Sequence, residues 1–255
     1  MNRLSRSVLV CGLSLLTIAC GRKGPLIYPD MLLPAAPSAV TSQQSGSLVR
    51  LQFTLPDKDR GGRSVGGVTG VKISRLVADA DQKDVCRSCI TDWLFRTIYL
   101  DHLPSDTQRF GNQLILLDSD VNIGKSYSYS IIPFLADGVD GSTSVVSTVR
   151  VAPPVPAPSL KIELFPTEVK LQIALHPETS GRLIGFNLYR SADATVRSFQ
   201  PINKELVKGN EYVDAVLERR VKYRYRTRAV VVNLSGDIAE SLESQEVEGM
   251  LKDDE

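Results

Sequence analysis

Two cysteines three positions apart, Cys86 and Cys89, are the residues of this chain whose type and spacing most directly suggest chemistry. In an oxidising compartment such a pair can close a local disulfide that stiffens its loop. A redox pair needs its first cysteine at the start of a helix, whereas a β-rich run over 93–100 follows here. Zinc needs about four ligands, and only the distant His102 and His176 could add to the pair. A disulfide is therefore the first interpretation, with redox chemistry and a metal site shared between chains as alternatives.

A row of basic residues near the C-terminal end is the second chemical feature. Cations occupy every second position, in the order Lys222, Arg224, Arg226 and Arg228. Alternate side chains of a β-strand share a face, so these four are predicted to form one basic face. Two interpretations follow. The face is either solvated and paired with acids such as Glu240 and Glu243, or it binds an anionic envelope polymer such as lipopolysaccharide or a cell-wall glycan.

Motifs for catalysis are missing from the sequence. It contains no Gly-x-Ser-x-Gly and no His-Glu-x-x-His. The glycine-rich stretch 61–67 lacks the Gly-Lys-Ser/Thr ending of a phosphate loop and precedes a predicted strand, so it indicates a long connecting loop. A net charge of +1, from 30 basic and 29 acidic residues, offers no concentrated basic surface for nucleic acid. We therefore expect a protein that is not an enzyme and takes no cofactor or metal, and we identify no small-molecule substrate.

The first 19 residues have the layout of a secretory signal. Arg3 and Arg6 precede an apolar run over 8–19, which is shorter than the roughly 20 residues that a membrane-spanning helix needs. The stretch Leu16–Gly21 resembles a bacterial lipobox. This resemblance implies that residues 1–19 are removed and that Cys20 carries fatty acyl chains such as palmitate, of which two or more hold a protein stably at a membrane. A signal that stays uncleaved, or is cleaved without lipidation, is the alternative.

Residues 20–37 are predicted to form a lipidated tether. Four prolines favour an extended spacer of roughly 3 Å per residue. The opening Gly21–Pro29 resembles that of a small outer-membrane lipoprotein that assists the lipopolysaccharide translocon, so a translocon-docking peptide is the alternative. In Gram-negative lipoproteins a glycine after the cysteine, as at Gly21, implies the outer membrane. We expect a lipid-anchored envelope protein, in the outer membrane and facing the periplasm.

The body of the chain repeats itself on either side of a proline-rich stretch. Alternating apolar residues over 49–55 correspond to those over 169–175, and Gly70–Arg75 corresponds to Gly185–Arg190. The repeats predict this division: signal peptide 1–19, tether 20–37, first domain 38–152, linker 153–158, second domain 159–249 and acidic tail 250–255.

A Tyr-x-Tyr pair completes each repeat, beginning at Tyr127 and at Tyr223. Together with the glycine-led strands, this order resembles the fibronectin type III domain. The resemblance implies an all-β chain of two tandem immunoglobulin-like β-sandwiches, and it makes these two tyrosines candidates for tyrosine corners, with a plain cross-strand aromatic as the alternative. The first domain is longer between its matched motifs, and the addition contains the cysteine pair.

Sandwich edges and end loops offer surfaces for strand addition, so we expect a protein-interaction or assembly module whose partners are envelope proteins. Binding of an anionic envelope polymer is the alternative function, and a redox or metal role at Cys86 and Cys89 is a third. The sequence does not identify the partner, because sandwiches host many unrelated tasks.

Lipidation predicts a specific mature end. The processed chain should begin at Cys20, carry acyl chains detectable by mass spectrometry, and require detergent for extraction, because the acyl chains partition into the bilayer. A Cys20→Ser variant should lose the acyl mass and the detergent requirement together. A mature chain that is soluble without detergent and starts before residue 20 would contradict this location.

Overall fold

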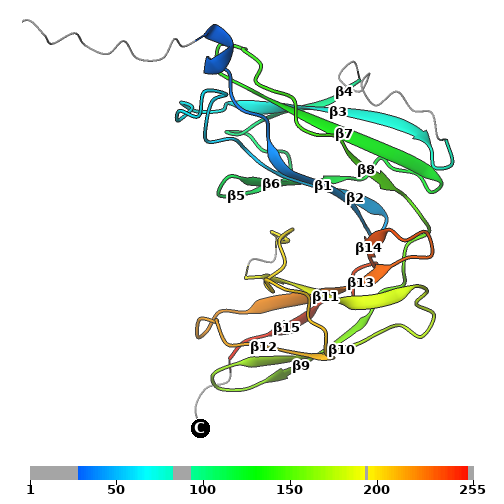
Figure 1. Ribbon diagram of the computed structural model, residues 1–255. Helices are drawn as coiled ribbons and strands as arrows, with labels where there is room; N and C mark the ends of the chain where they lie inside the picture. Colours follow the sequence, from blue (N-terminus) through cyan, green and yellow to red (C-terminus); the bar gives the residue numbers. More distant parts are fainter. Residues whose placement is uncertain (1–27, 83–92, 193–194, 252–255) are drawn as a thin grey trace, which may run out of the picture.

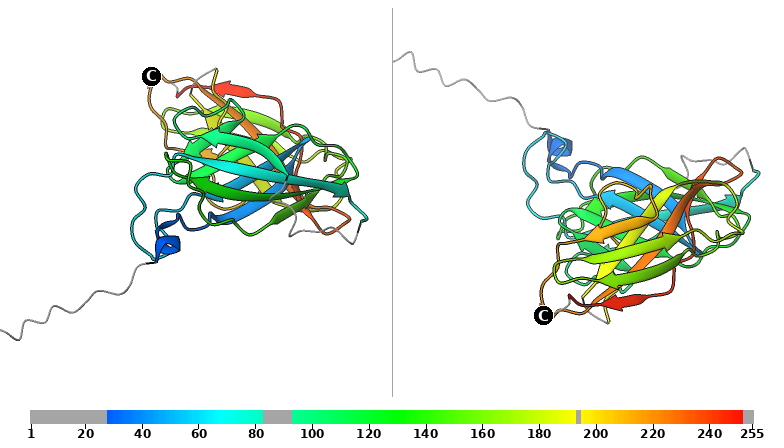
Figure 2. Two further views of the ribbon diagram at one scale, coloured as in Figure 1. Left: turned by 90° about the horizontal axis from the view of Figure 1, so that it is seen from above. Right: turned by 90° about the horizontal axis from the view of Figure 1, so that it is seen from below.

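The computed structural model describes residues 28–82, 93–192 and 195–251, which form two stacked domains of β-strands (Figure 1). One short 3₁₀-helix, η2 (Pro29–Leu32), precedes the first strand. No helix in these three ranges has the length and apolar character to cross a membrane. Seen from above and below, the two domains lie over one another (Figure 2).

Two packed sheets make up the first domain. One has the order β1-β2-β6-β5 and the other the order β4-β3-β7-β8, and all neighbours within them are antiparallel. Their bounds are β1 (Ser38–Ser45), β2 (Leu48–Thr54), β3 (Gly70–Asp79), β4 (Leu94–Tyr99), β5 (Thr107–Phe110), β6 (Gln113–Asp118), β7 (Lys125–Phe134) and β8 (Ser147–Arg150).

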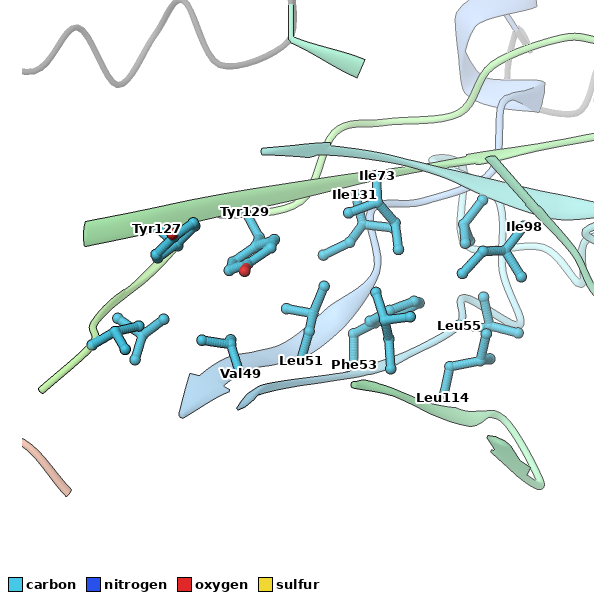
Figure 3. Close-up of a cluster of buried hydrophobic side chains, with 14 residues drawn as sticks. Val49, Leu51, Phe53, Leu55, Ile73, Ile98, Leu114, Tyr127, Tyr129 and Ile131 are labelled. Atoms are coloured by element: carbon cyan, nitrogen blue, oxygen red, sulfur yellow. The ribbon is translucent and has the colours of Figure 1, made fainter. Parts of the chain in front are cut away.

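Alternate side chains of facing strands build the first core, because successive residues of a strand point to opposite faces. On β2, Val49, Leu51 and Phe53 are fully buried, whereas the residues between them are only partly covered. They belong to one cluster with Ile73 and Ile131 of the opposite sheet (Figure 3). The alternation over 49–55 therefore predicted this face correctly.

The second domain repeats this plan with fewer strands. One sheet has the order β12-β10-β9, and in the other β13 pairs with β11, β14 and β15. The bounds are β9 (Ser159–Leu164), β10 (Val169–Ala174), β11 (Arg182–Ser191), β12 (Glu211–Asp214), β13 (Tyr223–Val232), β14 (Ile238–Glu240) and β15 (Val247–Gly249). Leu171, Leu188 and Tyr225 are fully buried in its core.

In each domain one sheet contains the first two strands, β1 and β2 or β9 and β10. The other sheet is built around the strand with the Tyr-x-Tyr pair, β7 or β13. This is the arrangement of fibronectin type III-like β-sandwiches. The predicted all-β fold of two tandem sandwiches is confirmed. The matched glycines have a steric role. A Cβ on Gly70 would lie 2.4 Å from the Ile98 carbonyl oxygen, and one on Gly185 would lie 2.9 Å from that of Val207.

Sheet pairing joins the two domains. β14 pairs in parallel with β1, with Gln44 opposite Ala239 and Ser45 opposite Glu240, so one sheet continues from the second domain into the first. Next to this pairing, Gln44 Nε2 donates to the Ala152 carbonyl at 2.7 Å, and the Ala152 amide donates to Gln44 Oε1 at 2.9 Å. Within the proline-rich linker that follows, the Val155 carbonyl accepts from the Leu242 amide at 2.8 Å, so the linker is held on both domains and is not a free hinge.

Glu240 lies at the centre of this joint with only 2% of its surface exposed. Its carboxyl group accepts hydrogen bonds from the Ser45 hydroxyl of the first domain, and from Asn187 Nδ2 at 2.6 Å and the Tyr189 hydroxyl at 2.7 Å of the second. An unpartnered carboxylate in this position would be strongly unfavourable, but three donors satisfy this one. The side chain therefore links the two domains directly.

Two predicted boundaries differ from the structure. Within the predicted tether, the Met31 and Leu33 carbonyls accept hydrogen bonds from Gly61 and Arg60, and Pro34 accepts one from Ser142, so residues 31–34 pack on the first domain. The sequence predicted an extended spacer there because prolines disfavour regular pairing, but carbonyl groups remain free to accept. Leu251, assigned to the acidic tail, is buried in the second core because it is apolar.

We predict that Glu240→Ala lowers the free energy of unfolding by at least about 2 kcal/mol, because it leaves the buried Ser45 and Tyr189 hydroxyls and the partly buried Asn187 amide without their acceptor. Urea denaturation of the full chain measures this change. The matched control is Glu178→Ala, an exposed glutamate of the same domain, which should change stability by no more than about 0.5 kcal/mol. Equal stabilities of the two variants would show that the joint does not depend on Glu240.

Candidate functional site

Three of the predicted site residues, Cys20, Cys86 and Cys89, lie outside the described residues, so the lipidation site and the disulfide stay predictions. The β-rich run after the cysteine pair forms β4, as predicted. In the three described ranges, no group of three or more histidine, cysteine and acidic side chains is arranged to hold a metal ion.

Each predicted tyrosine-corner residue makes a hydrogen bond to backbone five residues upstream. The Tyr127 hydroxyl oxygen accepts from the Asn122 amide at 2.7 Å, and that of Tyr223 accepts from the Glu218 amide at 3.0 Å. Both rings are buried. Each bond holds the turn before the central strand of its sheet, which makes these tyrosines structural residues.

A buried acid beside each corner was not identified from the sequence. In the first domain Asp118 Oδ2 accepts from Arg75 Nη1 and from the Tyr129 hydroxyl, both at 2.8 Å, and Asp118 Oδ1 accepts from the Asp120 amide. The guanidinium of Arg75 also stacks on Phe95, 3.9 Å from the ring centroid. Burial raises the pKa of the Tyr129 phenol, and Asp118 raises it further, so the phenol stays protonated and donates.

The second domain contains the same arrangement. Asp214 Oδ2 accepts from Arg190 Nη1 at 2.7 Å and from the Tyr225 hydroxyl at 3.0 Å, and Asp214 Oδ1 accepts from the Val216 amide at 3.2 Å. The signal was present in the sequence, because an aspartate precedes the first tyrosine of each Tyr-x-Tyr pair by the same interval. It was missed because a single acid at a strand end looks like any exposed turn residue.

The basic row lies on β13 and at the turn before it, and its members are paired with acids that follow β14. Lys222 and Arg224 contact Glu248 at 3.3 and 2.6 Å, and Arg226 contacts Glu243 at 2.9 Å. The remaining pair is Arg228 with Glu243 at 3.5 Å. Hydrogen bonds from Arg224 and then Lys222 lower the pKa of Glu248. Of the two acids expected to pair with this row, Glu243 does so, whereas Glu240 faces the joint.

Burial divides this row into two parts. Lys222 keeps 64% of its side chain exposed, whereas Arg226 keeps 3%. Arg226 and Arg228, at the inner end of the row, face the first domain. There they line one cavity with Arg50, which projects from the outward side of β2. The row is therefore not a single solvated face, because docking of the first domain covers its inner half.

A cleft lies at this junction. Its larger part has a volume of about 670 Å³ between Arg50 and Gln52 of β2 and the 198–204 segment of the second domain. A smaller cavity of about 140 Å³ adjoins it and shares Arg50 and Ser198 with it. Gln108 of β5 holds the cleft wall, because its Nε2 donates to the Arg197 carbonyl and its Oε1 accepts from the Phe199 amide at 2.8 Å.

An apolar surface lies on the other side of the first domain. Trp93 and Leu94 at the start of β4 and Tyr99 at its end are each more than half exposed, and Val77 of the neighbouring β3 is 46% exposed. β4 is the outermost strand of its sheet within the described part of the chain. We call this strand, with the exposed side chains of Trp93, Leu94 and Tyr99 at its two ends, the β4 edge; Val77 lies opposite the core residue Tyr127 and points to the other face of the sheet.

Comparison with known proteins adds little to this geometry. No family model matches the chain, and no curated protein matches it in sequence. Among solved structures, the chain is similar to the crystal structure of chicken CNTN1 FN1-FN3 domains, with 14% identity and a TM-score of 0.33, over 86% of this chain and 68% of that chain. The fold assignment therefore rests on the strand order and register described above.

The buried acids generate a stability prediction. Asp118→Ala should lower the free energy of unfolding by at least about 2 kcal/mol, because it leaves the buried Tyr129 hydroxyl without its acceptor and Arg75 with only the exposed Asp120 as a carboxylate partner. Asp140→Ala is the matched control. It removes an exposed partner of Lys72 and should cost less than about 1 kcal/mol. Chemical denaturation of both variants is the measurement, and a loss no larger for Asp118 than for Asp140 would contradict a structural role.

Proposed function

We propose that this chain is a non-catalytic protein-interaction or assembly module of the cell envelope, anchored to a membrane through acylated Cys20. The resemblance of Leu16–Gly21 to a lipobox supports the anchor, and Gly21 supports the outer membrane with the body facing the periplasm. The observation that supports a protein partner most directly is the β4 edge. Envelope proteins are therefore the proposed partners.

The β4 edge combines two properties that favour a protein ligand. β4 pairs with β3 on one side, through registers such as Val71 with Ile98, and among the described residues no strand pairs on its other side. An open edge presents backbone donors and acceptors, which proteins normally protect with charges, prolines or covering loops. Here the strand ends carry exposed apolar side chains instead, including Trp93 and Tyr99.

Strand addition uses both properties. A partner strand would hydrogen-bond to the open edge of β4, and its side chains would pack against the apolar residues at the two ends. Tryptophan and tyrosine bury a large area with few rotatable bonds, so they commonly dominate binding energy. Tyr99 is also held in place, because its ring meets that of Phe134 edge-on at a centroid distance of 5.4 Å.

The alternative proposals have less support from the described residues. An anionic polymer would have to compete with Glu248 for Lys222 and Arg224, and it could not reach Arg226 and Arg228, whose side chains are only 3% and 14% exposed. A redox or metal role at Cys86 and Cys89 stays a proposal that no described contact addresses. Its test is the double serine variant, which should lose activity and folding if the pair is functional.

Site-specific photocrosslinking in living cells tests the β4 edge. A photoreactive residue in place of Trp93 should give one dominant protein adduct, and Leu94→Lys should abolish that adduct by placing a charge in the contact. Both side chains are exposed, so thermal unfolding should be unchanged. The same photoreactive residue at Leu234, which is 91% exposed in the second domain, is the control and should give no such adduct. No adduct at position 93, or the same adduct from both positions, would refute a partner at this edge.

A further inference from the structure

We propose that the junction between the two domains contains a binding site for a phosphate group, built from arginines of both domains. The site is the small cavity of about 140 Å³. Its charged lining residues are Arg50 of the first domain and Arg197, Arg226, Arg228 and Glu243 of the second. This site is separate from the β4 edge and does not depend on the proposed protein partner.

The charges around this cavity are unbalanced. The Glu243 carboxylate is shared by three guanidinium groups, at 2.9 Å from Arg226, 3.3 Å from Arg197 and 3.5 Å from Arg228. Arg50 has no carboxylate partner in the described part of the chain, and its Nη2 donates to the Gln52 side-chain oxygen at 3.1 Å. With Glu246 beside Arg226 and the buried Glu240 behind Ser45 and Tyr189 included, four cations face three anions, which leaves one positive charge for a further anion.

Buried donors without acceptors give independent support. Arg226 is 3% exposed, and neither its Nε nor its Nη2 has a hydrogen-bond acceptor among residues 28–82, 93–192 and 195–251. Glu246 lies 3.6 Å from Nε, close enough for charge attraction but not for a hydrogen bond. Arg50 Nε is likewise buried without an acceptor in those ranges. Buried N–H groups of folded proteins normally have a partner, and an oxyanion in this cavity would supply acceptors for these donors.

The chemistry of the lining favours phosphate over a carboxylate. A guanidinium donates two parallel hydrogen bonds to a carboxylate or phosphate, and phosphate alone offers enough oxygens and charge for several guanidinium groups at once. The cavity holds roughly four to five times the ~30 Å³ of one water molecule, which suits a single tetrahedral oxyanion. The adjoining 670 Å³ cleft leaves room for the organic part of a phosphomonoester.

Charged side chains of both domains act electrostatically on the phenol of Tyr189 at the junction. Burial raises the pKa of the Tyr189 phenol and Glu240 raises it further, whereas Arg50 and Arg228 act in the opposite direction. The cations of β2 and β13 therefore converge only while the domains stay docked. By linkage, a phosphate bound between them should stabilise the docked chain.

Calorimetric titration of the purified full chain with inorganic phosphate, at constant ionic strength, tests the proposal. We expect saturable binding at one site, a Kd raised at least tenfold by Arg50→Gln, and partial recovery in Arg50→Lys. Arg50 is the suitable position because it forms no ion pair among the described residues, so its neutralisation should leave the fold intact. The control is Arg150→Gln, an exposed arginine of β8, which should bind phosphate as the unmodified chain does.

Further titrations distinguish the sources of the phosphate. Glycerol 3-phosphate carries the phosphomonoester of a lipid headgroup, so tighter binding of this compound would assign the site to an esterified phosphate, and tighter binding of inorganic phosphate to the free ion. Phosphate should also raise the Tm of the unmodified chain and not that of Arg50→Gln. Absence of saturable binding by either compound, binding unaffected by Arg50→Gln, or acetate binding as tightly as phosphate would overturn the proposal.

Discussion

The carboxyl group of Glu240 receives hydrogen bonds from Ser45 in one sandwich and from Asn187 and Tyr189 in the other, at the place where β14 pairs with β1. This contact turns two sheets into one and sets how the domains face each other. The cleft, the covered half of the basic row and the convergence of Arg50 with Arg226 all follow from it. Because Glu240 and the Ser45 and Tyr189 hydroxyls are buried, the joint has few alternative arrangements that satisfy all of them.

Within each sandwich a second buried network holds the loops that precede the central strand. Asp118 and Asp214 each bind an arginine, a tyrosine and a backbone amide two residues on, so each carboxylate at the end of its strand is bonded to two further strands. The same arrangement in both domains extends the internal repeat from apolar spacing to polar contacts. It also shows that the conspicuous tyrosines serve the scaffold, whereas the residues open to ligands lie at the β4 edge and the domain junction.

Much of the fold could be predicted because it is encoded in short-range patterns. Alternation over 49–55 identified β2 and its buried face, and the repeat identified the two-domain plan. The candidate sites were predicted less well. The basic row was recognised by its spacing, but Arg50 was not, since an arginine between Val49 and Leu51 is the expected outward residue of a half-buried strand. Its significance comes from the second domain, which is distant in sequence.

The sequence by itself determined which side chains point inward and which point outward, because strand geometry converts period-two spacing into faces. The stretch Leu16–Gly21 is also a sequence feature, and its resemblance to a lipobox is the basis for proposing export and lipidation. Only the tertiary structure decided what the outward faces meet. The pairing of β1 with β14 docks the first domain over Arg226 and brings Arg50 close to Arg226 and Arg228. Contacts of this kind join residues almost two hundred positions apart, and no local pattern records them, because they depend on how two finished cores dock.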